Sequence, residues 1–302
     1  MSTVLIAGGT GLIGKHLSQM LAEQGHSVRH LSRKEDFSAR FPAFAWDVDR
    51  GIVDEAAFKG VDHIVNLAGA GIADKAWTKA RKQLIIESRV KSTLLLKAQM
   101  EKTDWKPQSY ISSAAIGFYG NVPEDRWIGE DQPVGSGFLA ESCDAWEGAI
   151  RVVKNTSVRT VALRIGLVLT LDGGALPQLL SPLRFGIAPY MGSGQQWYAW
   201  IHIDDLCRMF VAAIENEEMK GVYNAVAPNP VRNKDFTRSI IKHWKSRALL
   251  IPAPAWALRI GLGEMADVVL SGARVSTNRI MNTGFEFEYP YLENALKALS
   301  KK

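Results

Sequence analysis

Three glycines near the N-terminus follow one another at intervals of three residues. They stand between a short apolar run and a stretch whose apolar residues recur at helical spacing. Glycine at these places permits a tight turn, close approach of the backbone to a pyrophosphate and close packing of helix on strand. The helix would also point free N–H groups and its positive dipole end at the phosphates. A turn that serves packing alone is the alternative, but the place on a first strand-to-helix connection favours nucleotide binding. The predicted contact residues are Gly8, Thr10, Gly11, Leu12, Ile13 and Gly14.

The end of the next predicted strand indicates which dinucleotide binds. Enzymes that use NAD place an acidic residue about 20 residues beyond the glycines, where it binds the ribose 2′-hydroxyl. Here Ser32, Arg33 and Lys34 occupy that place, and Glu35 and Asp36 follow. An arginine can pair with a 2′-phosphate through two hydrogen bonds, and a serine hydroxyl can donate another. We therefore predict NADP(H) as cofactor, bound by Ser32 and Arg33; the alternative is that Arg33 and Lys34 form a solvated loop pair.

Three further segments are expected to reach the cofactor. Asp47 ends the third predicted strand, where its carboxylate either accepts from the adenine amino group or caps a turn. The stretch 66–69 ends the fourth predicted strand with small residues that let the backbone approach the cofactor. Arg89, in the helical stretch that follows, either reaches a cofactor phosphate or forms a surface ion pair with Glu87 or Asp104. The expected contacts are Asp47, Leu67, Ala68, Gly69 and Arg89.

These residues need a scaffold of strands that alternate with helices. A long helical pattern covers 78–100, and a second helix carries Trp146, Ile150 and Val153. Alternation of this kind predicts an α/β fold with a doubly wound parallel sheet of the Rossmann type, whose ligands bind at the carboxyl ends of the strands. The predicted strands are Val4–Ala7, Ser27–Ser32, Ala43–Asp47, His63–Leu67, Ser109–Ser112 and Val158–Leu163.

Beyond residue 170 the pattern becomes less regular, with glycines and prolines between short segments. We predict a Rossmann domain over 1–170 that shares segments around 200–226 with a smaller α/β lobe over 171–302. Trp200–Asp205 should link the two, with Asp204 or Asp205 capping the following helix and His202 either structural or facing the pocket. The elements expected here are a helix at Asp204–Glu215, a strand at Gly221–Val226, a helix at Lys234–Trp244 capped by Asn233, and a helix at Leu292–Leu299.

Composition limits the classes of function. The chain has 302 residues, 47% of them hydrophobic, which is enough for a sizeable core. Its formal charge of +5 comes from basic residues spread along the chain, so we expect an anionic small ligand rather than nucleic acid. Cys143 and Cys207 lack metal-ligand spacing, so we expect no metal site and a reducing, cytoplasmic location. No apolar stretch approaches the length that a membrane span needs, so no membrane association is expected.

Several motifs together resemble the extended short-chain dehydrogenases/reductases. They are the glycine turn, the stretch 66–69, Ser112–Ala115 with Tyr119-Gly120, and Trp200–Asp205. A narrower resemblance, to the atypical branch labelled NAD-dependent epimerase/dehydratase or cell-division-inhibitor-like, is carried by the segments 117–120, 138–141, 146–147, 272–275 and 283–285. Residues from about 250 to 299 look like a C-terminal domain of undefined function found in that branch. The resemblance implies that Ile165, at the end of the sixth predicted strand, meets the nicotinamide end of the cofactor through its backbone.

The family's proton-transfer pair is missing from its expected place. In the family a Ser or Thr after the fifth strand holds the substrate oxygen, and a Tyr-x-x-x-Lys on the next helix moves the proton. Phe138 and Ser142 stand where that tyrosine and lysine would be. A phenyl ring cannot donate a proton, so the pair cannot be carried over. Ser112, Ser113 and Tyr119 are the substitute candidates, a serine orienting a carbonyl and Tyr119 protonating it; the alternative is that Tyr119 only packs.

Two classes of function remain open. The first is an NADP-dependent oxidoreductase or epimerase-like enzyme that acts on a small polar or anionic substrate, as a monomer or homodimer. The second is a non-catalytic NADPH-binding redox sensor or regulatory protein, which the missing pair would allow. A direct role in inhibiting cell division rests on a family label alone. Arg184, Arg274 and the loop 192–195 are candidates to bind an anionic substrate in the C-terminal lobe.

Overall fold

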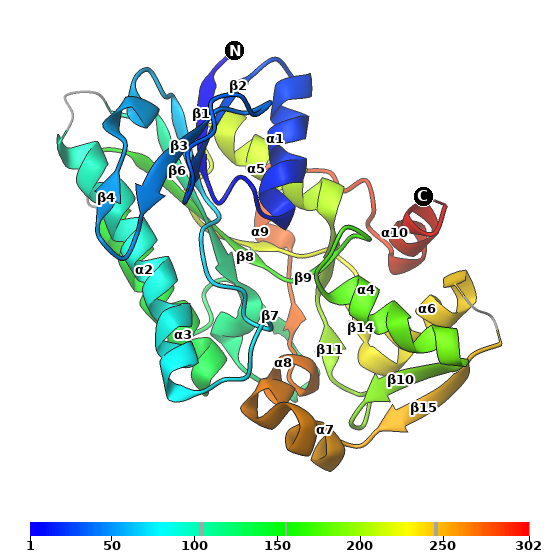
Figure 1. The fold of residues 1–302 in the computed structure, drawn as a ribbon. Helices are drawn as coiled ribbons and strands as arrows, with labels where there is room; N and C mark the ends of the chain where they lie inside the picture. The colour runs from blue at the N-terminus through cyan, green and yellow to red at the C-terminus, as the bar shows by residue number, and fades with distance from the viewer. Residues whose placement is uncertain (103–105, 155, 245–246, 302) are drawn as a thin grey trace.

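A twisted eight-stranded sheet forms the centre of the computed structural model, which describes residues 1–102, 106–154, 156–244 and 247–301 (Figure 1). Neighbouring strands are parallel, except for the last pair, β3 and β4, which is antiparallel. In spatial order the strands are β13 (Gly221–Ala225), β8 (Arg159–Ile165), β6 (Ser109–Ala115), β5 (His63–Asn66), β1 (Thr3–Ala7), β2 (Ser27–Ser32), β3 (Ala43–Asp47) and β4 (Ile52–Val53).

The strand order reverses beside β1, because the chain passes from β1 to β2 and β3 on one side and then returns to β5 on the other. At this point Ala7, the last residue of β1, is level with Leu31 of β2 and Asn66 of β5. In open α/β sheets such a switch point leaves room for a ligand outside the carboxyl ends of the strands. The loops after β1, β2 and β5 are therefore placed around one position, as the sequence predicted.

Helices cover both faces of the sheet, which confirms the predicted α/β fold class. Residues along β1 alternate between the faces: Val4 and Ile6 pack with α1 (Leu12–Glu23) and α5 (Ile203–Glu215), and Leu5 and Ala7 face the opposite core. That second core is covered by α2 (Lys79–Lys102) and α3 (Phe138–Lys154), which lie side by side (Figure 1). Because both faces are buried, β1 has an unbroken apolar run from Val4 to Ala7 instead of apolar residues that alternate with polar ones.

The C-terminal lobe has its own core, in which Trp200 and Phe236 are buried with the last helix of the chain. Two short strand pairs, β9–β12 and β11–β14, lie within this lobe, and a third, β7–β16, joins it to the sheet domain. Its helices are α4 (Ala175–Leu180), α6 (Asn233–Trp244), α7 (Ala255–Leu262), α8 (Asp267–Leu270), α9 (Asn278–Met281) and α10 (Leu292–Leu299). Its strands are β9 (Leu167–Leu169), β10 (Ile187–Met191), β11 (Trp197–Tyr198), β12 (Trp200–His202), β14 (Val231–Arg232), β15 (Leu249–Ala253) and β16 (Arg274–Val275), with β7 (Trp127–Ile128) contributed by the sheet domain. Four 3₁₀ helices complete the described elements: η1 (Glu55–Phe58), η2 (Ile116–Tyr119), η3 (Ser181–Phe185) and η4 (Gly263–Ala266).

Two elements that follow residue 200 belong to the sheet domain: α5 packs on α1, and β13 extends the main sheet beyond β8. The division at residue 170 stays a prediction. Two predicted caps are wrong in detail. Asn233 is the first residue of α6, and its side-chain oxygen accepts the backbone N–H of Met191 instead. The N-cap of α5 is His202, whose Nδ1 accepts the N–H of Asp204. Among the described residues no helix is long and apolar enough to span a membrane.

Candidate active site

The loop from Gly8 to Gly14, called the phosphate turn below, connects β1 to α1 and has no room for side chains at two of its glycines. Gly8 has φ +81°, and a side-chain carbon there would lie 3.0 Å from the backbone nitrogen of Ala68. A side-chain carbon at Gly14 would lie 2.5 Å from the oxygen of Gly8. The turn therefore closes tightly on itself and on the loop after β5, as the glycine spacing predicted.

The first turn of α1 keeps its N–H groups free of side-chain caps. The N-cap is Gly11, which has no side chain, and no acidic residue stands in the first turn. Thr10 and Gly11 are exposed, and Leu12 and Ile13 are half-buried. A helix begun in this way offers unpaired donors and its positive dipole end to an anion. The predicted contact residues are thus brought together at the start of helix α1.

The His30 ring packs against the backbone of the phosphate turn at Gly9. Sequence reasoning missed this residue. A side-chain carbon at Gly9 would lie 2.2 Å from the His30 ring, so only glycine fits there. Ser18 Oγ donates to the oxygen of Gly14 at 2.6 Å and is 2.7 Å from His30 Nε2, which must therefore carry the proton. Burial lowers the pKa of His30 to about 4. The adjacent glycines Gly8 and Gly9 were the signal for this close approach.

The end of β2 presents two exposed basic residues, which are followed by the exposed acids Glu35 and Asp36. Arg33 and Lys34 are exposed, and the Ser32 hydroxyl accepts the N–H of Lys34 at 3.4 Å. The Asp36 carboxylate is committed to its own turn, where it accepts from the Ser38 hydroxyl and two backbone N–H groups. These bonds hold the pKa of Asp36 below its usual value. Of the two acids that followed Arg33 in the sequence, Asp36 is thus occupied locally.

Asp47 caps the turn that follows β3. One of its oxygens accepts the backbone N–H groups of Asp49 and Arg50, each at 3.0 Å. Of the two roles predicted for Asp47, the structure shows the turn cap. A contact between its other oxygen and adenine stays a prediction.

The loop after β5 lies against the phosphate turn, and the half-buried cation Arg89 of α2 lies against this loop. Asn66 is buried, and its oxygen accepts the N–H of Ala68, which fixes the loop in place. A side-chain carbon at Gly69 would lie 3.0 Å from the guanidinium carbon of Arg89. Arg89 donates to the oxygen of Ile85 and lies over the Trp146 ring at 5.0 Å.

Arg89 has no carboxylate partner among the described residues. Glu87 pairs with Lys91 at 2.7 Å instead, and Asp104 lies outside the described residues. Burial lowers the pKa of the Arg89 guanidinium. Burying a cation without a counter-ion is costly, so this arrangement suits a site that receives an anion.

The two candidate serines lie in β6 at the carboxyl edge of the sheet, and both are buried. Ser112 Oγ donates to the backbone oxygen of Ser113 at 2.9 Å, and Ser113 Oγ donates to the oxygen of Asn66 at 3.0 Å. Ile165 ends β8 between Ala115 of β6 and Ala225 of β13. The serines are thus engaged with backbone groups next to the cofactor loop, and their role toward a substrate stays a prediction.

Tyr119 belongs to a set of polar residues called the Tyr119 network below. Tyr119, Glu147, Arg164 and Asn224 are buried, and Glu130 is half-buried. The Tyr119 hydroxyl donates to Asn224 Oδ1 at 2.6 Å and accepts from Arg164 at 2.8 Å. Arg164 also holds Glu147 through two hydrogen bonds of 2.7 and 2.9 Å. Glu130 accepts the backbone N–H of Asn224 at 2.8 Å. Burial raises the pKa of Tyr119. Its proton is committed to a neighbour, which favours the packing alternative over proton donation.

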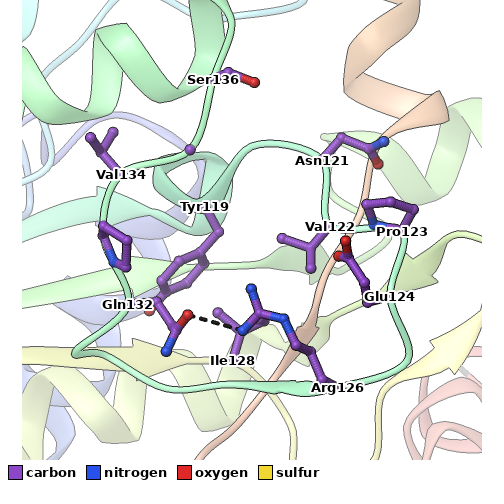
Figure 2. A pocket seen from close by; sticks show the side chains of 12 residues that line it. Tyr119, Asn121, Val122, Pro123, Glu124, Arg126, Ile128, Gln132, Val134 and Ser136 are labelled. Carbon is purple, nitrogen blue, oxygen red and sulfur yellow. Dashed lines mark hydrogen bonds between the residues drawn. The ribbon is translucent and has the colours of Figure 1, made fainter.

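One side of the Tyr119 ring faces a hollow of about 280 Å³ enclosed by the loop from Asn121 to Ser136 (Figure 2). Figure 2 shows the Arg126 and Gln132 side chains joined across it by a hydrogen bond of 2.9 Å. The hollow is mixed in character, with Val122, Ile128 and two prolines beside the polar groups.

The start of α3 carries Phe138 and Ser142, the residues at the family's tyrosine and lysine positions. The Phe138 ring packs edge-on against Trp77 with ring centres 4.7 Å apart. Lys82 Nζ, from α2, lies 5.1 Å from the centre of the Phe138 ring. Ser142 is buried and donates to a backbone oxygen one turn earlier. Neither residue at the expected Tyr and Lys positions can exchange a proton with a ligand.

Comparison with known proteins agrees with this geometry. A sequence model described as the NAD dependent epimerase/dehydratase family matches residues 4–141 and 166–225. The chain belongs to this family. A second model, described as a domain of unknown function, matches residues 253–299, which is the C-terminal segment expected for this branch.

Relatives of this epimerase-family chain extend over almost its whole length. An epimerase family protein SDR39U1 homolog, described as chloroplastic, from Arabidopsis thaliana is 37% identical over 98% of this chain and 86% of its own. The epimerase family protein YfhF of Bacillus subtilis is 34% identical over 98% of this chain and 97% of its own.

Solved structures show the same architecture. The crystal structure of human epimerase family protein SDR39U1 (isoform 2) with NADPH is 31% identical, covers 99% of both chains and superposes with a TM-score of 0.87. UDP-glucuronic acid 4-epimerase of Bacillus cereus, solved with UDP-glucuronic acid and NAD, superposes with a TM-score of 0.80 over 99% of this chain, at 18% identity. At that identity the second likeness concerns the fold alone.

Proposed function

We propose that this epimerase-family chain binds NADP(H) and acts as an oxidoreductase or epimerase-like enzyme on a small polar or anionic substrate. The observation that carries the proposal is the exposed Arg33 guanidinium at the end of β2, beside an Asp36 whose carboxylate is already engaged in its own turn. A guanidinium in this place suits a ribose 2′-phosphate better than a 2′-hydroxyl. The human relative solved with NADPH supports the same choice.

The residues of the chain fit a dinucleotide. The tight glycine positions of the phosphate turn leave space for a pyrophosphate, and the uncapped start of α1 offers it N–H donors. Arg89 would supply a positive charge to a phosphate, and the backbone of Leu67, Ala68 and Gly69 would pass close to the cofactor. When bound, the reduced nicotinamide would supply hydride for reduction of a carbonyl group. Ser112, Ser113 and Ile165 lie at the edge where this end of the cofactor is expected.

Replacing Arg33 tests the cofactor assignment. We expect Arg33→Ala to weaken NADPH binding by about 10- to 100-fold, since a charge-assisted contact contributes about 1.5–3 kcal/mol, and to leave NADH binding unchanged. Fluorescence titration of both nucleotides would measure this, with Arg151→Ala on the exposed side of α3 as the matched control. Equal affinity of the wild type for NADPH and NADH would contradict the assignment.

A second candidate is an NADPH-binding sensor or regulator without turnover. It is favoured by the Tyr119 hydroxyl, whose proton is committed to Asn224, and by Phe138 at the family's tyrosine position. Following the absorbance of bound NADPH while metabolite mixtures are added separates the two: oxidation supports the enzyme, and persistent binding without oxidation supports the sensor. We expect a cytoplasmic location, because Cys143 and Cys207 are free thiols buried in the core. We also expect a monomer or a homodimer.

A further inference from the structure

Two arginines, two tryptophans and an aspartate gather where the lobes meet. This Arg–Trp cluster consists of Asp125, Trp127, Trp197, Arg232 and Arg274. Trp127 lies in β7, which pairs with β16 and so places Arg274 directly beside it. Trp197 lies in β11, which pairs with β14 and so places Arg232 directly beside it. Figure 1 shows β7 and β11 near the middle of the molecule, between the sheet domain and the C-terminal lobe.

The guanidinium groups lie over the indole rings. Arg274 Cζ is 4.2 Å from the centre of the Trp127 ring and 4.8 Å from that of Trp197. Arg232 Cζ is 4.0 Å from the centre of the Trp197 ring. Stacking holds both cations in place without neutralising them. Arg232 also donates to the backbone oxygen of Gln195, which ties the cluster to the loop 192–195.

A single carboxylate serves both cations. Asp125 accepts from Arg274 at 3.0 Å with one oxygen and pairs with Arg232 at 3.2 Å through the other. Its side chain is 56% exposed, whereas those of Arg232 and Arg274 are 24% and 29% exposed. The cluster therefore has an excess positive charge, and its one counter-ion is the most solvated of the three ionic groups.

Two buried donors in the cluster have no acceptor. Arg274 Nε and the indole Nε1 of Trp197 are shielded from solvent, and neither has a hydrogen-bond partner within the described part of the chain. Buried donors are nearly always paired, and leaving one unpaired costs about 1–3 kcal/mol. The cluster has more cations than carboxylates, and two of its donors have no acceptor. Both features favour binding of an anion.

We infer that the Arg–Trp cluster binds the anionic group, a phosphate or carboxylate, of the substrate. The inference rests on the proposed function, because it gives that substrate an oxyanion and places it between the lobes. Asp125 holds the two guanidinium groups together in the free protein and yields its place to the ligand. Of the sequence candidates for such a site, Arg274 and the loop 192–195 meet here, and Arg184 lies apart in η3 over the Phe185 ring.

Inorganic phosphate is the probe that tests the cluster. The protein is first saturated with NADP⁺, so that the phosphate turn is filled, and phosphate is then titrated by calorimetry. We expect saturable binding that Arg274→Gln weakens by 10-fold or more while NADP⁺ affinity stays unchanged. Arg259→Gln, an exposed arginine paired with Asp267 in the same lobe, is the control and should bind phosphate like the wild type.

The Asp125→Asn variant distinguishes two hypotheses. In the first the cluster binds a ligand, and in the second it is a clamp, a set of ion pairs that only joins the two lobes. If the cluster binds a ligand, the Asp125 carboxylate competes with phosphate for the two arginines, so its removal should tighten phosphate binding several-fold. Phosphate should then raise the melting temperature of the variant more than that of the wild type. A clamp predicts lower stability with no gain in phosphate binding, and that result would overturn the inference. So would phosphate binding that does not depend on Arg274 or Arg232. If the wild type fails to bind NADP⁺, the proposed function fails, but the dependence of phosphate binding on Arg274 still decides the cluster.

Discussion

Two polar regions lie along the carboxyl edge of the sheet. In the phosphate turn and the loops beside it, donors are left open: α1 starts without a side-chain cap, and Arg33 and Arg89 have no carboxylate partner among the described residues. In the Tyr119 network, Arg164 bonds to Glu147 and Tyr119, and Tyr119 bonds onward to Asn224.

Polar residues at the same edge of the sheet thus serve opposite purposes, ligand binding in one region and stability in the other. The partly buried charge of Arg89 costs free energy in the free protein, and binding of an anion compensates it. The exposed donors of α1 and Arg33 are hydrated until an anion replaces the water. Closed networks stabilise the fold and leave nothing for a ligand. Mutations in the first region should therefore change cofactor affinity, and mutations in the second should change stability.

Breaking the buried ion pair should have the largest effect. Glu147→Gln leaves the Arg164 guanidinium, 4% exposed, without its counter-charge, and we expect a loss of about 3–5 kcal/mol in the free energy of unfolding. Urea unfolding would measure it. Asp144→Asn, which removes an exposed ion pair with Arg151 on the same helix, should cost less than about 1 kcal/mol. Equal losses in the two variants would remove the distinction between the regions.

Acid should weaken the support of the phosphate turn. Burial lowers the pKa of His30 to about 4, and that of His63 to about 4 as well, whereas an unfolded histidine has a pKa of about 6.5. The unfolded state thus binds protons first as the pH falls from 6.5 to 4, and stability is lost through that window, by about 2 kcal/mol for each histidine at pH 5.

Unfolding in urea at pH 7 and pH 5 would test this titration. The drop in stability between the two pH values should shrink by about half in His30→Gln, while Tyr119→Phe should keep the wild-type drop. A wild type that is equally stable at both pH values would show that these buried imidazoles do not control acid sensitivity.

Arg89→Met should show the reverse pattern from Glu147→Gln. Methionine keeps most of the packing of the stem but removes a half-buried charge without a counter-ion, so stability should stay the same or rise. NADPH affinity should fall by about 10-fold or more, since a charged contact contributes about 1.5–3 kcal/mol. Isothermal titration gives the affinity, and Lys91→Met, on the exposed side of the same helix, is the control. A large loss of stability without a change in affinity would place Arg89 with the structural residues.

Tyr119→Phe should have the smallest effect of the four. It removes the donor to Asn224 and the acceptor of Arg164, at a cost of about 1–2 kcal/mol in stability. NADPH affinity should not change. Once a substrate is identified, the same variant decides the catalytic hypothesis, because a proton donor would lose turnover and a packing residue would not.

Much of the cofactor region was predictable because its signals are local. One short stretch of sequence contains the glycines at 8, 11 and 14, the strand before them and the helix after them. Glycine at these positions indicates where the backbone must turn tightly or approach another group closely. All six predicted strands of the main sheet begin within one residue of their observed start, and Ser27–Ser32 and Ala43–Asp47 agree at both ends. The absence of the Tyr and Lys pair at Phe138 and Ser142 was also readable from residue types alone.

The partners of individual side chains were decided by the tertiary structure. Tyr119 meets Arg164 and Asn224 across 45 and 105 residues, and this depends on the register of β8 and β13 in the sheet. The Arg–Trp cluster is assembled from strands of only two residues each, too short to show a pattern.

Residue types and spacing therefore determined the fold class and the phosphate turn of this protein, since those follow from backbone geometry over short stretches. Whether a given polar side chain is free for a ligand or already engaged was decided only by packing, because its hydrogen-bond partner usually lies far away in the chain.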